Sequence, residues 1–293
     1  MSGSPPRGNR LRARLKIALT IAGSDSGGGA GIEADLKTFA ALGVHGAAAI
    51  AALTAQNTKG VFGVAPTTPE FLTKQIDAVL DDFCVGAIKI GMLATADNVR
   101  AVIGALRRDA LFRSDVTRAS RAPFVVCDPV LKASSGDALS GDGFLEALRD
   151  TLLPRVDLLT PNLAEAARVL GEAEAGDEKA MLRQGEAMLA LGPRAVLMKG
   201  GHLTSDDAVD WLVTKETKRR FAAKRIASAN THGTGCVLSS AIAARIVLGE
   251  ELADAIAAAK LFVSESIQRG RDVTLGHRAG PLQPLKLAAS SRP

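Results

Sequence analysis

The stretch IALTIAGSDSGGGAG at residues 17–31 decides the fold, because a short apolar run passes directly into a glycine-rich loop. The run at 17–22 has the length and composition of a buried strand, and residues 32–42 follow with the period of a helix. Five glycines among the nine residues 23–31 allow the backbone to approach a ligand closely and present free amides to it. The stretch therefore predicts a strand, a ligand-binding loop and a helix.

The same alternation continues along the chain, which is typical of βα units that build a largely parallel sheet covered by helices. Further strands are predicted at 47–53, 87–91, 124–127, 158–160 and 195–198. Helical patterns lie at 69–81, 95–107, 143–151, 163–170 and 178–190. An antiparallel hairpin is expected at 209–226 on the sheet edge, and two helices, 235–248 and 251–269, close the chain. The arginine-rich segment 107–121 is expected to be an exposed loop.

Composition and charge exclude several classes of protein. The formal charge of +5 comes from the first sixteen residues, which hold no acid and five basic residues: Arg7, Arg10, Arg12, Arg14 and Lys16. With no Tyr and one Trp there are few platforms for stacking bases, so a nucleic-acid partner is not expected. We predict a disordered basic tail at 1–15, one large domain at 16–285 and a flexible tail at 286–293.

The cysteines and the apolar runs indicate the cellular setting. Cys84, Cys127 and Cys236 are far apart and lack the spacing of a disulfide framework or a zinc site. A reducing, cytoplasmic location is therefore expected. No apolar run approaches the length of a membrane span, so no membrane partner is expected.

The glycine-rich loop does not fit two common nucleotide-binding motifs. Residues 29–34 match the relaxed dinucleotide fingerprint GxGxx[GA], but the second predicted strand and its loop, 46–59, contain no acidic residue for a ribose hydroxyl. The Walker sequence GxxxxGK[ST] does not occur. A plain turn explains one or two glycines, whereas the full set favours a ligand.

Polar residues follow other predicted strands, at the sheet edge where open α/β folds bind ligands. Gln56, in TAQNT at 54–58, suits a heterocycle edge with an amino group beside a ring nitrogen, and an ordinary turn explains the segment equally well. Asp128 and Glu165 can hold Mg²⁺ directly or through water, while Asn162 is also a typical helix N-cap. Lys199, beside two glycines, can reach a phosphate.

The motif NTHGTGC at 230–236 leads into a helix of small residues. Free amides and the positive end of the helix dipole at Gly233–Cys236 form an anion site suited to a transferred phosphoryl group. The same field lowers a thiol pKa, so we expect Cys236 to be partly thiolate and to accept a proton from a substrate hydroxyl. The alternative is a small buried cysteine at a helix start.

Taken together, the motifs resemble those of the ribokinase-like superfamily and, within it, the hydroxymethylpyrimidine/phosphomethylpyrimidine kinases. The resemblance covers about residues 16–285 and rests on GSDSGGGAGIEADLKT (23–38), TAQNT (54–58), KIGML (89–93), DPV (128–130), TPNLAEA (160–166), KGGH (199–202) and NTHGTGC (230–236).

The resemblance implies a three-layer α/β sandwich with helices on both faces of a mostly parallel sheet and a small antiparallel edge hairpin. It also implies ATP- and Mg²⁺-dependent phosphorylation of 4-amino-5-hydroxymethyl-2-methylpyrimidine, and then of its monophosphate, in thiamine biosynthesis. A homodimer is expected. The alternatives are a pyridoxal or pyridoxine kinase and a catalytically silent pyrimidine-binding regulator.

Residue roles follow from the resemblance only where the motifs match. Gln56 would hold the aminopyrimidine in a pocket lined by Gly23, Asp35 and Met92. Asp128 and Glu165 would bind the metal, and the nucleotide would contact Asn162, Glu165, Lys199 and Thr231. The catalytic group would comprise Gly233, Thr234, Gly235 and Cys236.

Overall fold

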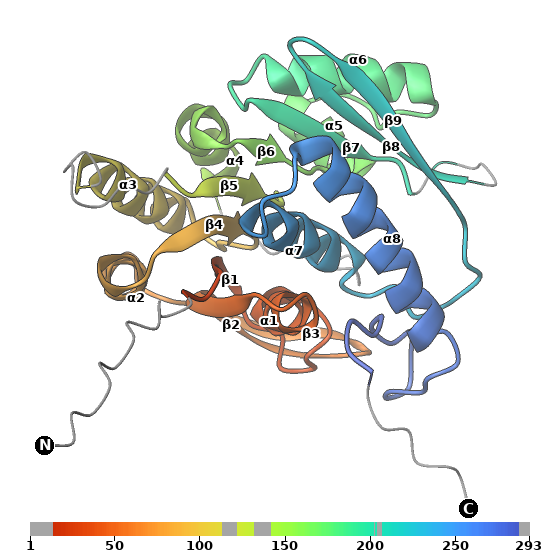
Figure 1. The fold of residues 1–293 in the computed structure, drawn as a ribbon, viewed down its shortest axis with the longest axis horizontal. Helices are drawn as coiled ribbons and strands as arrows, with labels where there is room; N and C mark the ends of the chain where they lie inside the picture. Colours follow the sequence, from red (N-terminus) through yellow and green to blue (C-terminus); the bar gives the residue numbers. More distant parts are fainter. Residues whose placement is uncertain (1–13, 113–121, 132–141, 202, 204–206, 287–293) are drawn as a thin grey trace, which may run out of the picture.

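Nine strands form one sheet in the computed structural model, which describes residues 14–112, 122–131, 142–201, 203 and 207–286 (Figure 1). The strands lie in the order β3-β2-β1-β4-β5-β6-β7-β8-β9. Their bounds are Ile17–Gly23 (β1), His45–Asn57 (β2), Gly60–Pro66 (β3), Val85–Ile90 (β4), Phe124–Cys127 (β5), Leu158–Leu159 (β6), Ala195–Lys199 (β7), Asp207–Thr214 (β8) and Lys218–Lys224 (β9). Six neighbouring strands run parallel, namely β2, β1, β4, β5, β6 and β7, whereas β3 and the β8–β9 hairpin are antiparallel.

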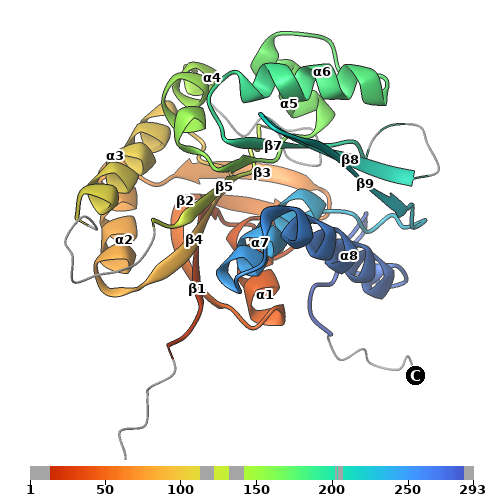
Figure 2. The same cartoon turned by 45° about the horizontal axis from the view of Figure 1, so that its top comes forward.

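Helices cover both faces of the sheet, as Figure 2 shows. One face carries α1 (Gly31–Ala41), α7 (Thr234–Val247) and α8 (Leu252–Gly270). The other carries α2 (Pro69–Asp82), α3 (Ala96–Phe112), α4 (Phe144–Ala147), α5 (Leu163–Leu170) and α6 (Glu178–Leu189). A π-helical turn at Leu148–Leu152 and a 3₁₀ turn at Leu153–Arg155 lead from α4 to β6. The predicted three-layer fold with a mostly parallel sheet is confirmed.

The alternation of side chains along β1 explains why the sheet needs helices on both faces. Leu19 and Ile21 are fully buried in the cluster beneath α2 and α3, and Ala18 is fully buried in the cluster beneath α7. A strand that is apolar on both faces is stable only when both are covered. The alanines of α7, Ala241 and Ala244 among them, allow this helix to pack closely on the sheet.

Two expectations about local structure are wrong. The second strand does not end in a turn at 54–58: β2 continues to Asn57 and returns as β3, with the amide of Lys59 donating to Asn57 Oδ1 at 2.8 Å. The β-branched and aromatic residues Val61, Phe62 and Val64 favour this edge strand, and the side chain of Asn57 stabilises the reversal. Helix α3 continues to Phe112, so the first residues of the predicted loop 107–121 are helical.

Several expectations fall on residues outside the described ranges. These are the basic tail up to residue 13, the remainder of the arginine-rich loop at 113–121 and the C-terminal tail at 287–293. The proposed domain limits stay a prediction. Among the described residues, no helix has the length and apolar character needed to cross a bilayer.

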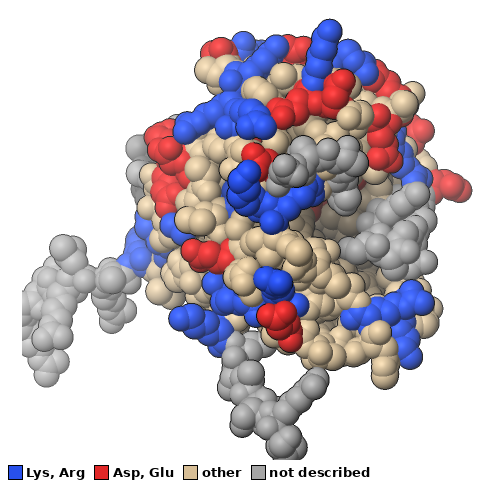
Figure 3. Space-filling view, turned by 90° about the vertical axis from the view of Figure 1, so that its right-hand side faces the viewer, with Lys and Arg blue, Asp and Glu red and all other residues tan. Residues whose placement is uncertain are grey.

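Charged residues of both signs share the surface. On the face shown in Figure 3, acidic side chains lie between the basic ones, so its described residues form no continuous basic stripe.

Candidate active site

A cavity of about 1140 Å³ opens where the parallel strands end. Its walls come from the ends of β1, β5 and β7, from the start of α5 and from the loop that leads into α7. All of the predicted site residues except Asp35 line it: Gly23, Gln56, Met92, Asp128, Asn162, Glu165, Lys199, Thr231, Gly233, Thr234, Gly235 and Cys236. The fold thus brings together residues that lie far apart in the sequence. Their individual roles stay predictions.

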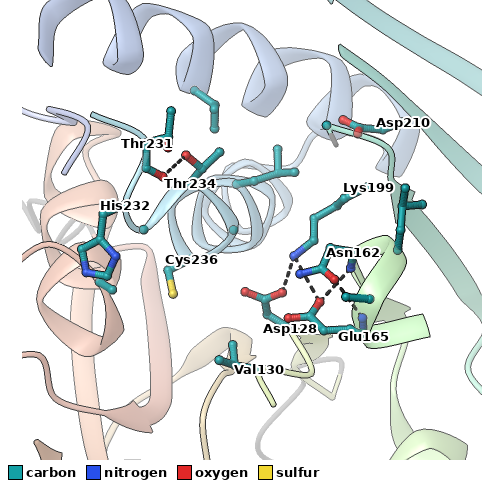
Figure 4. Close-up of a pocket in the computed structure, with 18 of the residues that line it drawn as sticks. Asp128, Val130, Asn162, Glu165, Lys199, Asp210, Thr231, His232, Thr234 and Cys236 are labelled. Atoms are coloured by element: carbon teal, nitrogen blue, oxygen red, sulfur yellow. Dashed lines mark hydrogen bonds and ion pairs between the residues drawn. The ribbon is translucent and has the colours of Figure 1, made fainter. Parts of the chain in front are cut away.

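Two ends of the cavity differ in chemistry. The first, which we call the glycine end, comprises the loop 23–31 with Gln56 and His232. The second, the charged end, comprises Asp128, Glu165 and Lys199. Figure 4 shows His232 on one side, the charged end on the other, and the sulfur of Cys236 between them.

The start of α7 packs directly on the glycine loop. Gly233 has a φ of 84°, which favours glycine, and a Cβ built there would lie 2.0 Å from the carbonyl oxygen of Gly29. The hydroxyl of Thr234 donates to the carbonyl of Thr231 at 2.6 Å, which fixes the turn before the helix. The amide of Thr234 donates back to the carbonyl of Thr231 at 3.3 Å, whereas the next amides of a helix lack intrahelical partners and are donors at the positive end of the dipole. The geometry fits the predicted anion site.

The environment of Cys236 contradicts the expected lowering of its pKa. Burial raises the pKa of the thiol to about 11, and the carboxylates of Asp35 and Asp128 act in the same direction. The charge of Lys89 and the amide of Gly31 oppose this effect without cancelling it. Because loss of hydration outweighs the helix dipole, Cys236 is a thiol at neutral pH in the free protein.

At the charged end, a lysine lies between two carboxylates. Lys199 Nζ is 2.6 Å from Asp128 Oδ1 and 3.8 Å from Glu165 Oε2. Burial favours a neutral Lys199, but the two carboxylates outweigh it and raise the lysine pKa. Burial, together with the charge of Asp128, raises the pKa of Glu165 to about 7, although Lys199 opposes the rise. This end therefore holds excess negative charge only partly compensated by one cation.

Asn162 and Glu165 form a capping box at the start of α5. The amide of Glu165 donates to Asn162 Oδ1 at 2.8 Å, and the amide of Asn162 donates to Glu165 Oε2 at 2.7 Å. The sequence pattern had allowed an N-cap for Asn162, and the structure contains it. The cap fixes the Glu165 side chain at the cavity wall next to Lys199.

The carboxylates fit a magnesium ion that is held mainly by water and phosphate. Asp128 and Glu165 offer oxygen ligands, and Mg²⁺ in proteins is commonly bound by one or two carboxylates with waters and substrate phosphates. Within the described ranges, no group of three or more His, Cys, Asp or Glu side chains could form an all-protein site.

Asp35 lies behind the cavity wall rather than in it. Its side chain is fully buried and accepts hydrogen bonds from Thr20 and Ser240, each at 2.6 Å, and forms an ion pair with Lys89 at 2.8 Å. Lys89 in turn reaches the cavity lining. Ser240 is one helical turn beyond Cys236, so this buried pair lies beneath the thiol. Met92 and Gly23 do meet in the wall, where a Cβ on Gly23 would lie 2.2 Å from Met92 Cε.

Sequence reasoning assigned no function to several polar groups of the cavity. Asp25 is the only acid of the glycine loop, and Lys89 is a charged residue within an apolar strand. Both patterns could have indicated that these residues belong to the site. Asp210 and Lys260 form an ion pair on the cavity wall next to Lys199, which is paired with Asp210 in the sheet, and Asp210 also accepts a hydrogen bond from the amide of Gly200 at 3.1 Å. This last pair joins β8 to α8 and could be found only from the fold.

The sheet order, the amide-rich start of α7 and the opposing lysine–carboxylate group define a class of protein. A phosphoryl group can be held at the helix start while a nucleotide is held toward the charged end, which is the arrangement of a ribokinase-like small-molecule kinase. Comparison with known proteins narrows the class.

Residues 25–283 match the phosphomethylpyrimidine kinase family, and the chain belongs to that family. The hydroxymethylpyrimidine/phosphomethylpyrimidine kinase of Rhizobium meliloti is 48% identical over 91% of this chain and 96% of its own. The crystal structure of phosphomethylpyrimidine kinase from Clostridium difficile 630 has 39% identity and a TM-score of 0.73, covering 87% of this chain and 100% of its own. The pyridoxal kinase of Staphylococcus aureus in complex with AMP-PCP and pyridoxal has 29% identity and a TM-score of 0.80, covering 93% and 94%.

Proposed function

We propose that the protein transfers the γ-phosphoryl group of ATP to 4-amino-5-hydroxymethyl-2-methylpyrimidine, and then phosphorylates the monophosphate to the diphosphate in thiamine biosynthesis. One observation carries the proposal: a single cavity holds Gln56 at one end, Lys199 with two carboxylates at the other, and the amides and thiol of residues 233–236 between them. Family membership supports the same activity.

In the proposed mechanism, the pyrimidine binds at the glycine end with its hydroxymethyl oxygen beside Cys236. The proton of the substrate O–H passes to the thiolate form of Cys236, a bond forms from the oxygen to the γ-phosphorus, and the bond to the β,γ-bridging oxygen breaks to release ADP. The amides of Gly233–Cys236 stabilise the equatorial oxygens. Since the pKa of Cys236 is raised to about 11, its thiolate is scarce but strongly basic.

At the charged end, Asp128 and Glu165 would hold Mg²⁺ directly or through water. The ion would neutralise the phosphate oxygens of the nucleotide when bound. Lys199 would then contact a phosphate as a point charge, from its present position 2.6 Å from Asp128.

The carboxamide of Gln56 supports a pyrimidine substrate more specifically than the fold does. The fold alone does not separate a pyrimidine kinase from a pyridoxal kinase, because the TM-score with the Staphylococcus aureus pyridoxal kinase is 0.80. A carboxamide, however, pairs with an amino group and an adjacent ring nitrogen at the same time, and an aminopyrimidine has such an edge. The pyridine ring of pyridoxal has no amino group.

Measuring ADP release with Mg²⁺ and ATP tests the proposal. The aminopyrimidine, its monophosphate and pyridoxal would each be supplied as sole acceptor, and both pyrimidines are expected to be phosphorylated. Turnover of pyridoxal alone would support the pyridoxal kinase alternative. ADP release at background with all three acceptors would support a silent binding protein.

A homodimer is part of the proposal. Phe62 on β3 and Leu53 on β2 are large apolar side chains with 69% and 55% of their surface exposed, which is typical of an association surface. Sedimentation velocity of the full chain is expected to give twice the monomer mass, and a monomer throughout the micromolar range would contradict it.

A further inference from the structure

Asp25 is the centre of the hydrogen bonds at the glycine end. It is 3% exposed, and its carboxylate accepts from the amides of Gly27 at 2.8 Å, Gly29 at 3.0 Å and Ala30 at 2.9 Å. The remaining partner is His232, whose Nε2 lies 3.1 Å from Asp25 Oδ2. Burial raises the pKa of Asp25, but the hydrogen bonds from His232 and these amides outweigh it and lower the pKa below its usual range. Asp25 is therefore an anion that can only accept.

This contact fixes which imidazole nitrogen carries hydrogen. A lone pair on His232 Nε2 would face the Asp25 carboxylate at 3.1 Å and repel it, so Nε2 must carry hydrogen and donate. The conclusion holds for the neutral ring and for the charged ring, since Nε2 is a donor in both. The same Nε2 also lies 3.3 Å from the carboxamide nitrogen of Gln56. Two N–H donors therefore face each other.

A second, independent contact shows a similar mismatch at the oxygen of the Gln56 carboxamide. The hydroxyl of Thr54 donates its single hydrogen to the carbonyl of Ser24 at 2.8 Å. Toward Gln56 Oε1, at 3.4 Å, Thr54 can then offer only a lone pair. An acceptor thus faces an acceptor on this side.

Rotating the Gln56 carboxamide by half a turn resolves both conflicts, because its oxygen and nitrogen occupy positions of the same shape. The amide oxygen then shares the single Nε2–H of His232 with Asp25 Oδ2, so that a second acceptor replaces a facing donor, and the amide nitrogen donates to Thr54. The backbone of Gln56 stays in place, since its amide donates to Ser26 Oγ and its carbonyl accepts from the same hydroxyl, each at 2.8 Å.

We propose that His232, held by Asp25, is a specificity-determining positioning residue that fixes the rotation of the Gln56 carboxamide. The inference rests on the proposed function, because it explains how the cavity selects its heterocycle. One lone pair of the amide oxygen is occupied by His232 and one N–H by Thr54, which leaves the other lone pair and the other N–H for a ligand. A ligand must match this order with a donor and an adjacent acceptor, which an amino group beside a ring nitrogen provides.

The corresponding 4-oxopyrimidine presents the opposite order. Its carbonyl accepts and its ring N–H donates, so both contacts with a fixed Gln56 are mismatched. Sites built around a substrate hydrogen bond can discriminate by about 10⁴- to 10⁵-fold against a ligand that lacks it. Once His232 no longer fixes the amide, rotation lets Gln56 pair with either edge, and the discrimination falls.

The test compares kcat/KM for 4-amino-5-hydroxymethyl-2-methylpyrimidine and its 4-oxo analogue in the wild type and in His232→Phe, which keeps a ring but has no N–H. The amino/oxo ratio is expected to fall by about 10-fold or more, with KM for ATP unchanged. His232→Gln, whose amide N–H can replace the imidazole donor, should restore part of the ratio. His277→Phe, at an exposed histidine, is the matched control and should keep it. A folded His232→Phe variant with the wild-type ratio would overturn the inference.

A second measurement does not depend on activity or on a stable variant. ¹⁵N NMR of the four histidines of the wild type reports which ring nitrogen is protonated. Hydrogen on Nε2 of His232 at neutral pH is expected, and a lone pair on Nε2 would contradict the inference. If the wild type does not phosphorylate the aminopyrimidine, the proposed function fails, and the NMR result still decides the state of His232.

Discussion

The two ends of the cavity are held in place by different forces. At the glycine end, close packing leaves no room for a side chain on the backbone: a Cβ on Gly29 would lie 2.7 Å from His232 Cδ2 and 2.9 Å from Pro281 Cβ, and Asp25 accepts from three amides and contacts His232. At the charged end, the backbone of Lys199 pairs with that of Asn162, but the functional side chains are joined by the ion pair of Lys199 with Asp128 and Glu165. Steric packing holds one shape, whereas ion pairs can exchange partners when a charged ligand arrives. We infer that the glycine end is preformed and that the charged end rearranges.

The largest expected effect lies between the two ends. Cys236→Ala leaves both intact but removes the proposed base, and such losses commonly lower kcat by about 10²- to 10⁴-fold. KM for the pyrimidine and for ATP should change little, and the melting temperature should stay close to that of the wild type. Steady-state kinetics of the purified variant provide the measurement. Wild-type turnover would show that Cys236 is not the base.

The pH dependence of Cys236 alkylation tests how burial sets its charge. Because burial raises the pKa of Cys236 to about 11, the reactive thiolate increases with pH throughout the neutral range. Below a pKa the ionised fraction grows about tenfold per pH unit, so the rate with iodoacetamide should rise by about 10³-fold from pH 7 to pH 10. The experiment uses a Cys84→Ser background, which removes an exposed thiol. An alkylation rate that levels off near pH 8 would instead show that the pKa of Cys236 is lowered, as the helix start alone predicts.

Selective damage to each end tests the comparison directly. Gly29→Ala forces His232 or Pro281 to move, and overpacking of this kind costs about 1–3 kcal/mol. We therefore expect KM for the pyrimidine to rise by about 10-fold or more. KM for ATP should stay within about twofold. Lys199→Met should give the reverse pattern. Two-substrate kinetics on both variants provide the measurement.

The matched control for the glycine substitution is Gly176→Ala. A Cβ at Gly176 meets nothing within 4 Å, so neither KM should change. If Gly29→Ala and Lys199→Met shifted the same KM, the two ends would not be separate.

The sequence was sufficient for the fold and for most cavity residues, because both depend on local patterns. Apolar runs specify strands, and polar residues just after parallel strands converge at one edge. It was insufficient where tertiary burial decides the outcome. The helix start at Cys236 is visible in the sequence, whereas the desolvation that raises its pKa comes from elements packed around it. Asp35 belongs to a motif that the sequence analysis identified. Its ion pair with Lys89, however, joins residues 54 positions apart, and this tertiary contact holds Asp35 behind the cavity wall.

The smallest expected effect concerns the capping box that supports the charged end. Asn162→Ala removes the N-cap of α5 and should lower the free energy of unfolding by about 1 kcal/mol. Because the cap also fixes Glu165 near Lys199, KM for ATP should rise by a few-fold. Denaturant unfolding and steady-state kinetics measure the two effects.

Asp177→Ala provides the matched control, since Asp177 caps α6 by accepting from the amide of Ala180 at 2.7 Å and does not line the cavity. It should lose similar stability, again about 1 kcal/mol, without any change in KM. Equal kinetic effects in both variants would mean that loss of a helix cap perturbs the site only through general destabilisation. A kinetic effect confined to Asn162→Ala would show that the charged end depends on the exact placement of Glu165, as expected for a site held by ion pairs rather than by backbone packing.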